Sequence, residues 1–164
     1  MSNLLRAVAA AFVALIASGQ EKATGVIMQR NMSLELAKSI AEAALAECQS
    51  KGYHTTVAVV DRSGQLMVIL RDEQAGLQTI EMARRKAYTA RTFRTTTLEF
   101  EKRTTPDKPI AGQRNLTDIL ALSGGAPIQV GNDTIGGVGS AGSTLEMDDA
   151  CAKAGIAKVA HLLK

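Results

Sequence analysis

Two cations in this 164-residue chain, Arg71 and Lys86, each border a run of apolar residues. A cation in such a place needs a partner, and we expect it to be Asp61, Asp72 or an acidic ligand such as a carboxylate or propionate. Desolvation would also lower the pKa of a buried Lys86 and make its amine usable as a base. Two hypotheses follow. Either Arg71 and Lys86 bind an acidic ligand, or Lys86 is the base or electrophile of an enzyme in which Asp61 and Arg71 orient a small organic acid.

The two histidines differ in their surroundings. His54 precedes a predicted strand and is the better candidate for an axial ligand of a metal or haem iron. His161 falls in register with the apolar residues of the last predicted helix, which favours a core position. Two histidines so far apart do not indicate a zinc enzyme, and no Ser-His-Asp or Cys-His set is evident. The carboxylates of Asp148 and Asp149 are interpreted as charges at a helix start.

Glycine is concentrated near the C-terminus, at Gly136, Gly137 and Gly139 of a predicted strand. Such a cluster indicates that another backbone, or a flat ligand, approaches the strand closely. Together with Gly142 the cluster formally matches G-x-G-x-x-G, but the chain ends with the next helix, so the parallel strand that a dinucleotide site requires does not follow. An anion bound by the first amides of that helix stays open.

Composition indicates one soluble globular domain, with 46% hydrophobic and 21% charged residues. Aromatic residues make up 3% of the chain and the net charge is +3, which argues against a nucleic-acid partner. Most of the basic residues between positions 84 and 103 are expected on a solvated helix face. Cys48 and Cys151 exclude a disulfide-dense scaffold, and whether they pair is left open.

Residues 1–19 are predicted to be a signal peptide, followed by a single domain over 20–164. The apolar run Ala7–Ala17 has eleven residues, too few for a spanning helix of about 20, and small residues follow it where a peptidase would cleave. The alternative is a buried N-terminal helix. Cleavage before Gln20 would leave a periplasmic or secreted protein with no membrane segment and a side-chain balance of 18 − 16 = +2; without cleavage it would be cytoplasmic.

The predicted order of elements is helix, strand pair, helix, strand pair, helix. Strands joined by tight turns are antiparallel, so the expected class is α+β, with helices packed on an antiparallel sheet. The predicted elements are a helix from a Ser33 cap to Gly52, strands Thr55–Val60 and Gln65–Arg71, a helix over 78–94, an irregular segment over 95–114, a short helical turn Leu116–Leu122, strands Ala126–Val130 and Thr134–Ser140, and a helix from Ser143 or Thr144.

Four segments, in order, resemble the GlcG/HbpS-like family, which also supplies the C-terminal domain of PduO proteins. The resemblance covers about residues 33–160. The segments are VAVVDRSG (57–64), RKAYTARTFRTTT (85–97), GGAPI (124–128) and the stretch from Ile135 to Gly142 with Asp149 and AKAGI (152–156).

The resemblance implies a profilin-like sandwich whose sheet has five antiparallel strands, assembled into homo-oligomers from dimers to octamers. It also implies binding of a small molecule, with haem or another tetrapyrrole as the first candidate. The macrocycle would lie against apolar walls from Val57, Val59, Met67 and Ile69. The candidate ligand-binding residues are Arg71, Lys86, Thr89, Gly124, Gly125, Pro127, Gly139 and Ser140, with His54 as the iron ligand.

The alternative implied by the family is an enzyme or accessory protein of glycolate-type metabolism, with Lys86 and Asp61 as catalytic residues. A purely structural or partner-binding module is a third possibility. This chain has Gln65 where many members have histidine after the hairpin glycine, and Arg71–Gly76 differs from the usual Arg-x-Asp-Gly-Ala.

Overall fold

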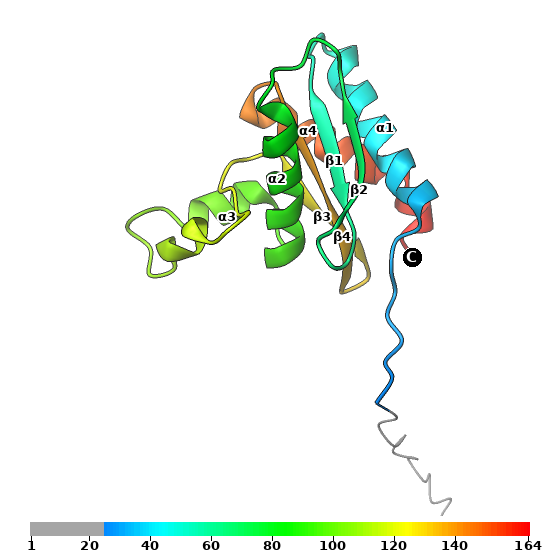
Figure 1. Ribbon diagram of the computed structural model, residues 1–164, viewed down its shortest axis with the longest axis vertical. Helices are drawn as coiled ribbons and strands as arrows, with labels where there is room; N and C mark the ends of the chain where they lie inside the picture. The colour runs from blue at the N-terminus through cyan, green and yellow to red at the C-terminus, as the bar shows by residue number, and fades with distance from the viewer. Residues whose placement is uncertain (1–24) are drawn as a thin grey trace, which may run out of the picture.

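The computed structural model describes residues 25–164 as an α+β fold (Figure 1). The predicted signal peptide lies outside the described residues. The elements are α1 (Leu34–Ser50), β1 (Thr56–Val60), β2 (Leu66–Arg71), α2 (Thr79–Phe93), α3 (Thr97–Arg103), the 3₁₀ turn η1 (Ala111–Asn115), β3 (Gly125–Val130), β4 (Asp133–Ala141), α4 (Leu145–Lys158) and the 3₁₀ turn η2 (Ala160–Leu162).

The sheet has four strands in the order β2-β1-β4-β3, and every neighbouring pair is antiparallel. The predicted α+β class is therefore confirmed, and the predicted fifth strand is wrong for residues 25–164. Both hairpins form as expected. Between the two hairpins the chain forms α2, and the segment after α2 folds as α3, η1 and turns, so it supplies no strand.

The segment 95–114, predicted as irregular, contains a helix because Thr96 caps it. The Thr96 hydroxyl accepts a hydrogen bond from the Glu99 amide at 3.3 Å, which satisfies a donor at the start of α3. The helical turn predicted over Leu116–Leu122 is absent. Asp118 has φ +65°, a left-handed conformation that interrupts a right-handed helix.

Helices cover both faces of the sheet. Figure 1 shows α2 in front of the strands, with α4 behind them and α1 along the side of β2. The side chains of β1 alternate accordingly. Val57 and Val59 belong to the core under α1 and α4, whereas Ala58 packs with Ala83 of α2. All five residues of β1 are buried, as the apolar run predicted.

Glycines of β4 allow α2 to lie directly on the strand backbone. A Cβ added at Gly139 would overlap the carbonyl oxygen of Ala83, and one at Gly137 would overlap that of Ala87. Of the two predicted causes of the glycine cluster, a close backbone or a flat ligand, the structure shows the backbone at these two positions. The space beside Gly137 and Gly139 is occupied by α2.

We expect Gly139→Ala to lower the free energy of unfolding by about 1–3 kcal/mol, because the new methyl group would force α2 away from the sheet. Gly112→Ala is the matched control, since a Cβ there meets nothing within 4 Å. Urea unfolding of both variants measures the difference. Equal midpoints would show that α2 is not held against β4 as described.

A disulfide between Cys48 and Cys151 joins α1 to α4, with their Cα atoms 5.6 Å apart. The sequence left open whether Cys48 and Cys151 pair, and the structure shows that they do. Both cysteines are fully buried. Burial was predicted for Cys48, but as a free apolar side chain and not as half of a disulfide.

No helix within residues 25–164 has the length and apolar character needed to cross a bilayer.

Candidate functional site

Lys86 is wholly buried in the middle of α2 and forms an ion pair inside the protein. Its Nζ donates to Asp148 Oδ2 at 2.7 Å and to the Ser140 carbonyl at 2.9 Å. Burial lowers the pKa of Lys86, and the Asp148 carboxylate opposes that effect in part. The predicted protein partners, Asp61 and Asp72, are therefore wrong for Lys86, which pairs with Asp148.

Asp148 has two structural roles. Its Oδ1 accepts hydrogen bonds from the Ser143 hydroxyl at 2.7 Å and the Ser143 amide at 3.2 Å, just before α4, while Oδ2 binds Lys86. A Cβ at Gly124 would lie 2.8 Å from Lys86 Nζ and 2.7 Å from Asp148 Cβ, so the pair also requires glycine there. The sequence placed Asp148 correctly at a helix start, but no local signal indicated its partner 62 residues away.

Several predicted ligand-binding residues have partners within the protein. The Thr89 hydroxyl accepts from the Leu120 amide at 2.9 Å. Gly125 donates to the Thr97 hydroxyl at 2.8 Å, and Ser140 donates to the Gly124 carbonyl at 2.8 Å. Pro127 is half-buried on β3, opposite Gly137. Together with Gly139 these residues surround the contact between α2 and the β3–β4 hairpin.

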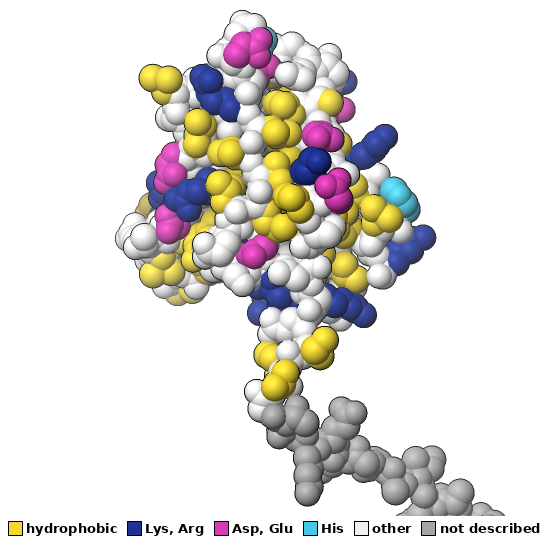
Figure 2. Space-filling view, turned by 45° about the vertical axis from the view of Figure 1, so that its right-hand side comes forward, with side chains coloured by type: hydrophobic (Ala, Val, Ile, Leu, Met, Phe, Trp, Pro, Cys, Tyr) yellow, Lys and Arg dark blue, Asp and Glu magenta, His cyan; other side chains and the backbone are white. Residues whose placement is uncertain are grey.

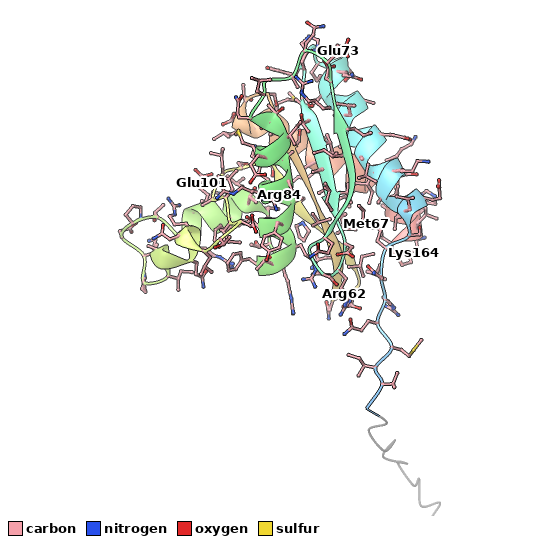
Figure 3. The ribbon with its side chains drawn as sticks, in the orientation of Figure 1. Arg62, Met67, Glu73, Arg84, Glu101 and Lys164 are labelled. Carbon is pink, nitrogen blue, oxygen red and sulfur yellow. A yellow bond between two sulfur atoms is a disulfide. The ribbon has the colours of Figure 1, made fainter. Side chains whose placement is uncertain are left out.

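Asp61 holds the turn of the first hairpin. Its Oδ1 accepts from the amides of Ser63 and Gln65 at 2.8 and 2.9 Å. The turn lies at the opposite end of the hairpin from Arg71, which pairs with Thr56. Figure 3 shows this separation through the adjacent labelled residues Arg62 and Glu73. The structure does not bring Asp61, Arg71 and Lys86 together, so it does not support an organic-acid site built from these three residues.

His54 lies at the other end of the hairpin and is held by Asp72. The His54 Nδ1 and Asp72 Oδ1 atoms are 2.9 Å apart, and the histidine side chain is 45% exposed. Asp72 also accepts from Gln49 Nε2 and the Gln74 amide, both at 2.9 Å; these bonds, with that of His54, lower the pKa of its carboxyl. An ionised Asp72 can only accept, so His54 Nδ1 is the donor of this bond; in the neutral ring the lone pair is then on Nε2.

The same end of the molecule carries a cation and exposed apolar side chains. Arg71 is exposed and donates to the Ala75 carbonyl. Leu77 and Ile80, where α2 begins, are 89% and 45% exposed, and Ile69 of β2 is 36% exposed. We call His54, Arg71, Asp72, Leu77 and Ile80 the His54 end.

The apolar walls predicted for a ligand are mostly unavailable. Val57 and Val59 are fully buried beneath α1, and Met67 packs against the same core. Only Ile69 of the four is exposed. Among residues 25–164, helices cover both faces of the sheet, so Val57 and Val59 are not available to line a ligand site.

His161 is exposed, so its predicted core position is wrong. The stripe with which His161 shares its register lies on the exposed side of α4, since Ala150 and Ala157 are exposed. The buried face of α4 is formed instead by Cys151, Ala152 and Gly155 together with Asp148 and Asp149. Within residues 25–164, no group of three or more His, Cys, Asp or Glu residues is placed to hold a metal ion.

Two clefts lie away from the His54 end. One of about 430 Å³ lies between α3 and the beginning of α4. A second of about 240 Å³ lies beside the first hairpin and is lined by Arg62, Ser63, Gly64, Tyr88, Arg91 and Thr92. Neither cleft could be expected from the sequence, because their linings come from segments far apart in the chain.

This arrangement of helices and sheet is found in solved haem-related proteins. The structure of HbpS superposes with a TM-score of 0.76 at 34% identity, covering 80% of this chain and 92% of HbpS. The structure of a PduOC:heme complex superposes with a TM-score of 0.74 at 27% identity, covering 79% of this chain and 95% of PduOC.

Sequence comparison leads to the same group of proteins. The model of the family described as "Haem degrading protein HbpS-like" matches residues 32–157. An uncharacterized 15.0 kDa protein of the dhaT-dhaS intergenic region of Citrobacter freundii is 29% identical over 119 residues, which are 71% of this chain and 84% of that protein. The chain belongs to the HbpS-like family, as the four segments indicated.

Proposed function

We propose that this protein binds haem, or a related tetrapyrrole, at the His54 end. The observation that carries the proposal is the half-exposed His54 ring, fixed through Nδ1 by the buried Asp72 carboxylate, with Nε2 available. Histidines that ligate metals usually donate their other ring N–H to such a carboxylate. The relative PduOC, which has a solved haem complex, supports haem as the ligand class.

The residues of the His54 end fit haem as an open surface site. His54 would supply the axial nitrogen, and the exposed Arg71 guanidinium would pair with a propionate. Leu77 and Ile80 would contact the apolar face of the macrocycle. Bound haem would contribute a redox-active iron, while the chain would hold it by ligation, ion pairing and apolar contact.

Self-association is the second part of the proposal. β2 is an edge strand, and its Leu66 and Ile69 are 46% and 36% exposed. Figure 2, which turns α1 and β2 towards the viewer, shows hydrophobic side chains gathered in a band on this side of the molecule. A second copy packed on β2 would cover this surface and give the open haem site a second wall, in an assembly from dimer to octamer.

Export is the third part. The apolar segment before Gln20 supports a cleaved signal peptide and a periplasmic or secreted protein. The Cys48–Cys151 disulfide supports the same compartment, because such bonds persist where the surroundings are oxidising.

Titration of the full chain with hemin tests the haem proposal. We expect the Soret band to shift at micromolar protein and His54→Ala to weaken binding at least about tenfold, since the axial nitrogen is lost. Asp72→Asn should weaken binding as well, because it removes the carboxylate that orients the ring.

His161→Ala is the matched control, since this second histidine is also exposed but lies in η2. It should bind hemin as the unmodified protein does. Light scattering on the same samples reports whether haem-bound protein is a monomer or an assembly. The absence of a Soret shift in the unmodified protein, or equal affinities of His54→Ala and His161→Ala, would overturn the proposed site.

A further inference from the structure

We propose that the cleft between α3 and the beginning of α4 binds a small organic cation, namely a primary amine attached to an apolar body. The cleft has a volume of about 430 Å³, within the range of about 300–1,000 Å³ that is common for small-molecule sites. Leu98 of α3 and Leu145 of α4 contribute apolar walls. This site is separate from the His54 end and goes beyond the proposed haem function.

Carboxylates dominate the charge of the cleft. Glu101, Glu146 and Asp149 line it, against the single cation Lys102. The Lys102 ammonium is bound to Glu99 at 2.9 Å, and Lys153 pairs with one oxygen of Asp149 at 2.5 Å. The carboxylates of Glu101 and Glu146 have no ion-pair partner among residues 25–164. The cleft therefore favours a positive guest and disfavours the propionates of haem.

The lining also contains two residues that are largely buried, and one of them has a polar atom without a partner. Ser123 is 3% exposed. Asp149 is 8% exposed, and its Oδ1 has no hydrogen-bond partner among residues 25–164. Buried polar groups are ordinarily hydrogen-bonded. An ammonium carries three donors and no acceptor, so it matches an acceptor set of this kind.

Helix α4 alone does not account for this lining. Acidic residues in a first helical turn are stabilised by the helix dipole, which is a sufficient reason for Glu146 but not for Asp149, which lies beyond that turn. Glu101, however, comes from α3, which Figure 3 shows projecting from the side of α2 away from β2. Ser123 comes from the loop before β3. Three separate segments thus present oxygen atoms to one apolar-walled space.

Calorimetric titration of the full chain with 2-phenylethylamine tests the proposal. Two probes with a similar ring and chain serve as controls, the neutral 2-phenylethanol and the anionic 3-phenylpropanoate. We expect the amine alone to bind, with an affinity that falls as salt is raised. Glu101→Gln should weaken amine binding about tenfold, the effect of losing one charge-assisted hydrogen bond.

Glu42→Gln is the matched variant, because Glu42 is an exposed residue of α1, outside the cleft. It should leave the affinity for the amine unchanged. Both variants should fold, since each changes a side chain that is not buried. Thermal melting checks this. The proposal is overturned if the amine does not bind, if the alcohol binds equally well, or if Glu101→Gln and Glu42→Gln have the same affinity.

Discussion

Lys86→Met is expected to lower the free energy of unfolding by about 3–5 kcal/mol, the usual effect of removing one partner of a buried ion pair. The substitution leaves Asp148, which is 1% exposed, with a charge supported only by Ser143. It also leaves the Ser140 carbonyl without its donor. Urea unfolding at neutral pH measures the loss.

The double variant Lys86→Met/Asp148→Asn should recover a large part of that loss. Asparagine retains an oxygen for Ser143 but carries no charge, so no buried ion is left uncompensated. Lys102→Met is the surface control, because its pair with Glu99 is about 60% exposed on both sides; its effect should stay within about 1 kcal/mol. If the effects of the two single substitutions at Lys86 and Asp148 simply add, the pair is not coupled as the structure indicates.

Removal of the disulfide is expected to cost about 3–5 kcal/mol of unfolding free energy. In the chain-entropy description, a cross-link restricts the unfolded chain more when the loop that it closes is longer. Here the cysteines are 103 residues apart. Unfolding in urea with and without dithiothreitol measures the effect in the unmodified protein.

Cys48→Ala/Cys151→Ala supplies the control for this measurement. Without reductant it should unfold near the midpoint of the reduced protein, and dithiothreitol should not shift its midpoint. A reduced protein as stable as the oxidised one would contradict the prediction. The experiment bears on export too, because a chain that depends on this bond is less stable in a reducing compartment.

Much of the fold could be predicted because its signals are local. The Ser33 hydroxyl accepts from the Leu36 amide at the start of α1, three residues away. The Asp61–Gly64 turn closes the first hairpin over four residues. The α3 helix was not predicted, although its cap, Thr96, is also local, because the polar composition of residues 95–114 and their prolines, Pro106 and Pro109, favour an irregular segment.

The candidate site was less predictable. His54 and Arg71 were identified as residues that could bind a ligand, and they do lie at one end of the molecule. Their surroundings could not be read from neighbouring positions: Asp72 reaches His54 across the ends of two strands, and Gln49 reaches Asp72 from α1. Lys86 was identified as a cation that needs a partner, but the predicted partners, Asp61 and Asp72, are wrong, since Lys86 pairs with Asp148.

From the sequence alone follow the α+β class, the two hairpins, the Ser33 cap of α1 and, through four ordered segments, the family. These depend on interactions between residues a few positions apart or on motifs that remain contiguous. Only the tertiary structure decided that α2 lies against the β4 glycines, that Lys86 pairs with Asp148, and that Cys48 pairs with Cys151. Each of these contacts joins residues 50 or more positions apart, and such contacts form only where packing of the whole chain brings the two segments together.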